Sequence, residues 1–237
     1  DILNKIKHYH PSNNEIHFQN CKMAVKGNIL NKVEHQWKQP LNFISTNLLN
    51  LEIKSELGQL ENDSVEKINS NIETALMQIS NNISILNKCF ESSNKKTYFP
   101  LNNAIEKNFA LLEYKLKQNN IILAKKYKDH NFEIHNYEGD VSLKIMLVLL
   151  VLVECTIKEK EKSEELIIDI SYEKHENETA LLFSLKKLVS FNYIVEMFNL
   201  EFFLIKTLLQ RTNSIFSSQV KDSHSLFKIT FSKEDLL

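Results

Sequence analysis

The sequence predicts an α+β protein in which a long two-helix hairpin precedes a separate α/β sandwich. Two apolar seams with helical spacing predict the hairpin, and shorter alternating helical and strand-like segments predict the sandwich. A polar stretch at 91–97, followed by Pro100, predicts the connection between them. We therefore expect an N-terminal segment at 1–19, either a linker or the end of a preceding region, then the hairpin at 20–94 and the sandwich at 98–237.

Both helices of the hairpin are predicted from apolar residues that recur every three or four positions, which places them on one face of a helix. The first seam contains Leu30, Val33, Trp37, Leu41, Ile44, Leu48 and Leu51. The second contains Val65, Ile68, Ile72, Leu76, Ile79, Ile83, Leu86 and Phe90. Between the seams, Gly58 is suited to end the first helix, while Asp63 and Glu66 have the spacing of a capping box that opens the second. The short turn predicts antiparallel helices.

A single hairpin cannot bury this much apolar surface against itself. The seams therefore predict a homodimer in which two hairpins form a four-helix bundle. Pro40 lies inside the first helix, where it removes a backbone hydrogen bond and predicts a kink.

The region after Pro100 changes to shorter elements typical of a mixed sheet covered by helices. The helix at 141–159 is apolar on nearly every side, so we expect it to be deeply buried. The other predicted helices are 101–117 and 194–210, and the predicted strands are 121–127, 132–135, 166–172, 180–185, 214–219 and 226–231.

Composition excludes several classes of function. The 29 basic and 30 acidic residues nearly cancel, so no overall charge draws the chain to nucleic acid. The longest apolar run, Ile145–Val153, is far shorter than the ~20 residues that span a bilayer, so we expect no membrane segment in this piece. Cys21, Cys89 and Cys155 form no metal-binding or disulfide pattern. We expect reduced cysteines, no bound metal and a cytoplasmic location.

The segment Glu34–Ile44 reads E-H-Q-W-K-Q-P-L-N-F-I, and Lys22-Met23-Ala24 and Gly27 precede it. It resembles the histidine box of sensor histidine kinases, most closely the subgroup whose box reads H-Q-W-R-Q-P-L-N. The resemblance implies that His35 is the phospho-accepting histidine and that the first helix kinks just after it. Trp37 falls on the apolar seam, so we interpret it as a packing residue.

Gln39 follows His35 by about one helical turn, so both side chains are expected on the same exposed face. In the family, the polar residue at this place is associated with dephosphorylating the partner. A neutral amide there can orient a water molecule toward an aspartyl-phosphate. Gln36 stands where many relatives carry a carboxylate, and we include it among the candidate catalytic residues. The implied partner is the receiver domain of a response regulator, which carries its own Mg²⁺. The residues expected to contact that domain are Asn42, Phe43 and Thr46.

The C-terminal half is similar in outline to the ATPase domain of these kinases, most clearly at residues 199–209. Its nucleotide-binding residues are missing. The chain has 3 glycines, and none follows Gly139, which excludes a glycine-rich phosphate loop. The helix that should offer asparagines to magnesium has none at 147–155, with Glu154 near one expected place, and 186–190 replaces the segment with the adenine-binding aspartate. We expect ATP binding to be lost and no cofactor to be needed.

Three functions remain open from the sequence. The first is a degenerate histidine kinase that acts as a phosphatase of a phosphorylated response regulator through Gln39 and His35. The second is a histidine phosphotransferase that relays phosphoryl groups through His35. The third is a dimeric interaction module without chemistry.

Overall fold

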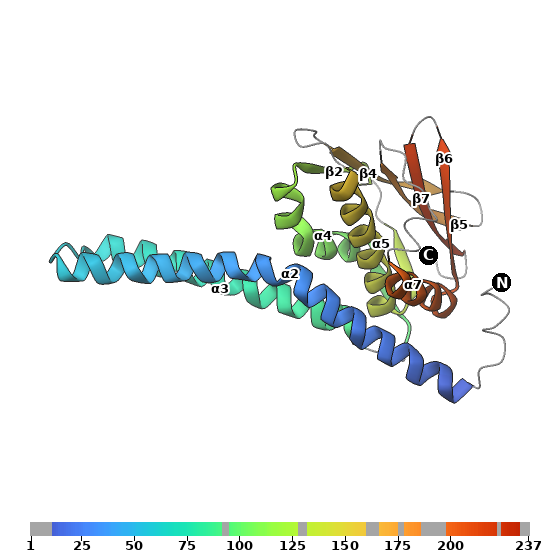
Figure 1. The fold of residues 1–237 in the computed structure, drawn as a ribbon, viewed down its shortest axis with the longest axis horizontal. Coiled ribbons are helices and arrows are strands. Elements are labelled where there is room, and N and C mark those ends of the chain that lie inside the picture. Colours follow the sequence, from blue (N-terminus) through green and yellow to red (C-terminus); the bar gives the residue numbers. More distant parts are fainter. Residues whose placement is uncertain are drawn as a thin grey trace. The chain divides into compact units, whose positions relative to one another are not determined.

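A computed structural model describes residues 11–91, 95–127, 132–159, 166–174, 178–185, 198–221 and 224–232 (Figure 1). The chain divides into two compact units. The hairpin unit consists of Ile29–Lys88, and the sandwich unit combines Asp1–Asn28 with Cys89–Leu237. Within the described residues, we find no helix that is both long enough and apolar enough to cross a membrane.

Two antiparallel helices build the hairpin unit, as predicted. They belong to α2 (Pro11–Glu56) and α3 (Asn62–Phe90). Asn71 Nδ2 of α3 donates to Asn47 Oδ1 of α2 at 3.4 Å, and Lys54 Nζ donates to Ser64 Oγ at 3.1 Å nearer the turn. The residue numbers of the paired side chains increase along α2 while they decrease along α3, so the two helices are antiparallel.

Gly58 ends α2 with a φ of +63°, a left-handed conformation that glycine adopts without strain. Its N–H donates to Ser55 O, and Gln59 N–H donates to Lys54 O, which together form a Schellman motif. The predicted cap is therefore confirmed. The predicted capping box is wrong, because α3 begins at Asn62 and Asp63 already lies in the first turn. There its carboxylate faces the positive end of the helix dipole.

The sandwich unit contains a five-stranded sheet in the order β2-β4-β5-β7-β6. Only β2 and β4 run parallel, and the other neighbours are antiparallel, so the sheet is mixed as predicted. The strands are β2 (Ile121–Lys125), β4 (Leu166–Lys174), β5 (Glu178–Leu185), β6 (Ser214–Lys221) and β7 (His224–Ser232). A separate antiparallel pair joins β1 (Thr97–Pro100) to β3 (Glu133–Asn136).

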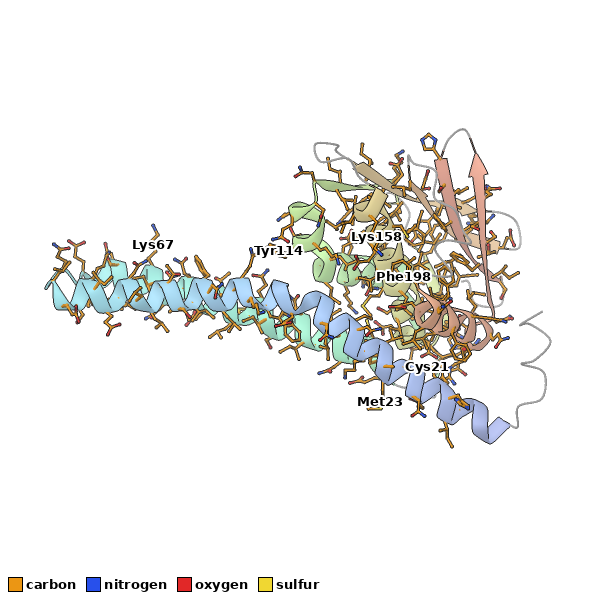
Figure 2. The ribbon with its side chains drawn as sticks, viewed as in Figure 1. Cys21, Met23, Lys67, Tyr114, Lys158 and Phe198 are labelled. Atoms are coloured by element: carbon orange, nitrogen blue, oxygen red, sulfur yellow. The ribbon has the colours of Figure 1, made fainter. Side chains whose placement is uncertain are left out.

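The described helices that lie wholly in this unit are α4 (Leu101–Gln118), α5 (Glu138–Glu159) and α7 (Asn199–Arg211). Helix α5 contacts both α4 and α7, which places it at the centre of the helical layer (Figure 1). Every residue from Val141 to Val153 is buried, which confirms the prediction from its all-round apolar sequence. Figure 2 shows the side chains crowded inside this unit, where the hydrophobic core lies.

Several boundaries differ from the sequence prediction. Residues 97–100, expected to finish a polar linker, form β1 because Phe99 is buried and pairs with Ile134 across the strands. Helix α2 begins at Pro11, well before the predicted start of the hairpin helix, and its first part belongs to the sandwich unit. The segment at 186–197, with the expected adenine-binding position and the start of the helix predicted at 194–210, lies outside the described residues. The kink at Pro40 stays a prediction.

Candidate functional site

The histidine box lies on α2 in the hairpin unit. His35 and Gln39 are four residues apart on this continuous helix, which places them about one turn apart on the same face. The side chain of Gln39 is exposed. The side chains of His35 and Gln36 lie outside the described part of the structure, so only their positions along the helix are placed.

The residues expected to contact a partner continue the same face of α2. Asn42 and Thr46 follow Gln39 by one and two turns, both are exposed, and Thr46 Oγ1 donates to Asn42 O at 2.9 Å. Phe43 lies beside them with 48% of its surface exposed. Gln39, Asn42, Phe43 and Thr46 thus form an exposed stripe along α2. The stripe offers amide and hydroxyl groups next to an apolar ring, a surface suited to bind another protein.

The predicted apolar seam of α2 is only partly covered within the single chain, since Ile44 is partly buried whereas Leu41 and Leu48 are exposed. Pro40 is buried and Trp37 is partly buried, which agrees with a packing role for the indole. On the outer surface, Lys38 Nζ forms an ion pair with Glu34 at 2.8 Å, with both side chains more than half exposed. This pair balances the charge beside His35 and contributes little to stability.

In the sandwich unit, the one acidic residue near an expected magnesium position is already paired. Glu154 Oε1 of α5 lies 2.5 Å from Lys115 Nζ of α4, and both side chains are more than four-fifths buried. A metal ion at Glu154 would have to compete with this ammonium group. Among the residues that the structure describes, no group of three His, Cys, Asp or Glu side chains could hold a metal ion.

Apolar side chains pack closely around α5. Val148, Val151 and Leu152 of α5 face Phe202 and other apolar side chains across a cavity of about 10 Å³. A void of this size holds at most one water molecule, so the side chains of α5, α7 and the sheet are closely packed at this place.

Glu154→Asn tests whether one restored asparagine brings back magnesium binding. We expect no gain of Mg²⁺-dependent ATP binding in calorimetry, because the glycines and the adenine-binding aspartate remain absent. The loss of the Lys115 ion pair should lower the free energy of unfolding by roughly 1–2 kcal/mol. Glu113→Asn is the matched control, since Glu113 pairs with Lys117 at an exposed place on α4. An ATP signal that appears only in Glu154→Asn would show that the remaining contacts are intact.

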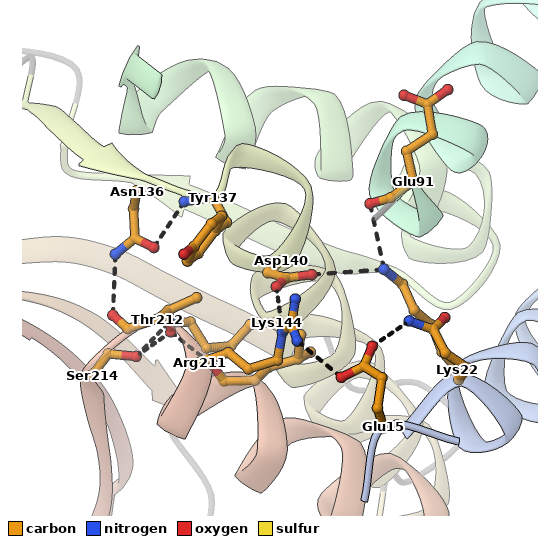
Figure 3. Close-up of polar contacts among 12 residues, drawn as sticks. Glu15, Lys22, Glu91, Asn136, Tyr137, Asp140, Lys144, Arg211, Thr212 and Ser214 are labelled. Atoms are coloured by element: carbon orange, nitrogen blue, oxygen red, sulfur yellow. Dashed lines mark hydrogen bonds and ion pairs between the residues drawn. The ribbon is translucent and has the colours of Figure 1, made fainter. Parts of the chain in front are cut away.

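A buried charged cluster in the sandwich unit was missed by sequence reasoning. Asp140 at the start of α5 contacts Lys22 of α2 and Arg211 of α7, as Figure 3 shows. The available signal was Lys22 itself, which has the helical spacing of the buried residues Phe18 and Val25. Burial lowers the pKa of Lys22, and the nearby Asp140 carboxylate opposes part of that shift.

A second buried cation lies near this cluster. Lys144 Nζ of α5 is fully buried and donates to Thr212 Oγ1 at 2.8 Å and to Ser214 Oγ at 2.5 Å. It also lies over the ring of Phe231 at 4.7 Å. These contacts tie α5 to the end of α7 and the start of β6, and we interpret them as structural.

The arrangement of the sandwich unit is that of histidine kinase catalytic domains. The nucleotide-free catalytic domain of the histidine kinase ThkA matches 59% of this chain and 96% of its own at 14% identity, with a TM-score of 0.50. A second nucleotide-free form of that domain matches the same shares at 12% identity, again with a TM-score of 0.50. This likeness establishes the fold, and the predicted fold class is confirmed.

A longer match gives a lower score. The histidine kinase AdeS of Acinetobacter baumannii matches 85% of this chain and 98% of its own at 14% identity, with a TM-score of 0.46. No protein-family model and no curated protein matches the sequence.

Proposed function

We propose that this chain is a two-component signalling protein that dephosphorylates a response regulator and does not use ATP. The observation that carries this proposal is the exposed stripe on α2, where the Gln39 amide lies one turn from His35 within a histidine box. The histidine kinase fold of the sandwich unit supports the signalling class.

The chemistry needs little from the protein, because an aspartyl-phosphate is already reactive. In the proposed step, the oxygen of a water molecule attacks phosphorus, the bond from phosphorus to the aspartate oxygen breaks, and inorganic phosphate leaves. The Gln39 amide can accept a hydrogen bond from that water and orient it, and His35 is its neighbour on the helix. The Mg²⁺ that balances charge on the phosphoryl group belongs to the regulator. Asn42, Phe43 and Thr46 provide the adjoining contact surface.

Loss of ATP binding is part of the proposal. The sequence lacks the glycines and asparagines that hold the phosphates and magnesium, and Glu154 is held by Lys115. A protein that only removes phosphoryl groups has no need of these contacts, whereas a kinase cannot work without them.

We also propose that the chain acts as a homodimer in the cytoplasm. Leu41 and Leu48 of α2, and Leu76 and Ile83 of α3, each have 41–53% of their surface exposed, and each pair is spaced by two helical turns. A second hairpin would cover these side chains. Cys21, Cys89 and Cys155 are all free thiols, as expected in a reducing compartment.

The test uses a response regulator charged with labelled acetyl phosphate and mixed with the purified chain. The proposal expects the label to appear as inorganic phosphate faster than in the regulator alone, with no ATP present. Label on His35 would instead favour the phosphotransferase, and an unchanged label would favour the interaction module. A regulator variant without its phosphorylated aspartate controls for label that binds nonspecifically.

A further inference from the structure

One buried carboxylate in the sandwich unit joins three segments that lie far apart in the sequence. Asp140 Oδ2 accepts a hydrogen bond from Arg211 Nε at 2.9 Å, and Asp140 Oδ1 lies 3.6 Å from Lys22 Nζ (Figure 3). The Asp140 side chain has no exposed surface and that of Lys22 only 3%. Helix α2 is thereby held to α5 and α7 through a single acid.

Further contacts extend this attachment along α2. Phe18 is 2% exposed, and its ring lies under both cations, 4.8 Å from the Arg211 guanidinium carbon and 5.7 Å from Lys22 Nζ. Val25 is fully buried, and Glu15 Oε2 lies 3.4 Å from Arg211 Nη1 at the exposed rim. Lys22 Nζ also donates to Glu91 O at the end of α3. Met23, between the buried positions, is 73% exposed, so one face of the helix is docked and the other is open.

Asp140 and Glu15 together balance the charges of Lys22 and Arg211, but one oxygen of Asp140 has no hydrogen bond among the described residues. In the part of the chain that the structure describes, Asp140 Oδ1 has no hydrogen-bond partner, and 3.6 Å is too long for a bond to Lys22. A buried ion pair of this kind stabilises less than well-packed apolar side chains would, because both ions lose their water. It still enforces one docking position, since displacing either partner leaves a buried charge. Such a contact fixes one docking position of α2 but stabilises it only modestly, so α2 can also detach from α5 and α7.

We propose that Asp140, Lys22 and Arg211 form a latch by which the sandwich unit binds the chain's own helix segment Glu15–Asn28, which precedes the histidine box. Because α2 continues without a break from Pro11 to Glu56, a rotation or shift of that segment is transmitted toward His35 and Gln39. The domain, which lacks nucleotide-binding residues, would then control the hairpin by holding or releasing this segment. Only the effect on dephosphorylation rests on the proposed function; the latch itself does not.

Native-state hydrogen exchange on the full chain tests the latch. In the unmodified protein, amides at 15–28 should exchange by an opening that leaves β5 and β7 protected. Asp140→Asn, which removes the charge and keeps the shape, should speed exchange at 15–28 by about tenfold or more with little change in β5 and β7. Glu73→Gln, at an exposed position of α3, also replaces one carboxylate by an amide and is the matched charge control. Exchange at 15–28 that occurs only by global unfolding would overturn the latch.

A second variant keeps the test decisive if Asp140→Asn fails to fold. Lys22→Met removes the cation of the docked helix and leaves the bond between Asp140 and Arg211 in place. Exchange at 15–28 should again be faster than in the unmodified chain, with Lys67→Met at an exposed position of α3 as the matched control, and unchanged exchange in Lys22→Met would contradict the proposal. Dephosphorylation of a charged regulator should change in the same direction in Asp140→Asn and Lys22→Met. If the chain proves to be no phosphatase, the exchange data still decide whether the latch exists.

Discussion

Gln39→Ala should slow dephosphorylation of the regulator by about 100-fold, a size typical of losing the group that orients a reacting water. The amide is exposed on α2, and in the proposed step it orients the water, so its removal would leave that water without its orienting group. His35→Ala should retain a measurable part of the activity, because the imidazole is only a neighbour of the water. Release of inorganic phosphate from a charged regulator gives both rates.

Gln78→Ala is the matched control, since Gln78 is an exposed amide of α3 outside the histidine box. All three variants are expected to change stability little. Thermal unfolding followed by circular dichroism therefore shows whether a loss of activity comes from a loss of folding. In a phosphotransferase the order reverses, because the imidazole is then the nucleophile, and His35→Ala would be inactive. Full activity in Gln39→Ala would show that the amide does not position water.

Leu76→Asp should weaken the dimer by at least about 100-fold, because it would bury a carboxylate without a partner in the bundle. Leu76 is 52% exposed in the single chain and lies two turns from Ile83, also exposed, on α3. Ile72 and Ile79 of the same seam are already partly buried within the hairpin, so changing them would also disturb the hairpin itself. Light scattering and sedimentation measure the effect.

Gln78→Asp introduces the same charge at an exposed position on another side of α3 and should leave the dimer intact. A monomer for the unmodified chain at micromolar concentration would contradict the bundle. It would also remove the explanation for the exposed leucines of α2 and α3.

Local patterns were sufficient to predict most of the fold. The seams of α2 and α3 repeat with the helical period over many turns, and Gly58 ends α2 as its conformational freedom suggests. The apolar run in α5 predicted its burial, and the strands coincide with segments rich in β-branched and aromatic residues. These features depend on neighbours in the sequence, which is why they could be read from it.

Features that depend on distant partners were not predicted. Strand β1 contains Pro100 and follows a polar stretch, and only its pairing with β3 makes it a strand. The spacing of Lys22 with Phe18 and Val25 indicates a buried position, but the sequence does not indicate its partners, because Asp140 and Arg211 lie far along the chain. In the candidate site, the spacing of His35 and Gln39 predicted their common face, but no local pattern indicates that Lys115 pairs with Glu154.

Isothermal calorimetry with Mg²⁺ and ATP, combined with a search for label on His35 from γ-labelled ATP, tests the central claim most directly. We expect no heat of binding up to millimolar ATP and no labelled His35, because the sequence has no glycine after Gly139, no asparagine at 147–155 and no aspartate at 186–190. Magnesium-dependent binding at micromolar ATP, with label transferred to His35, would show that the chain is a working kinase.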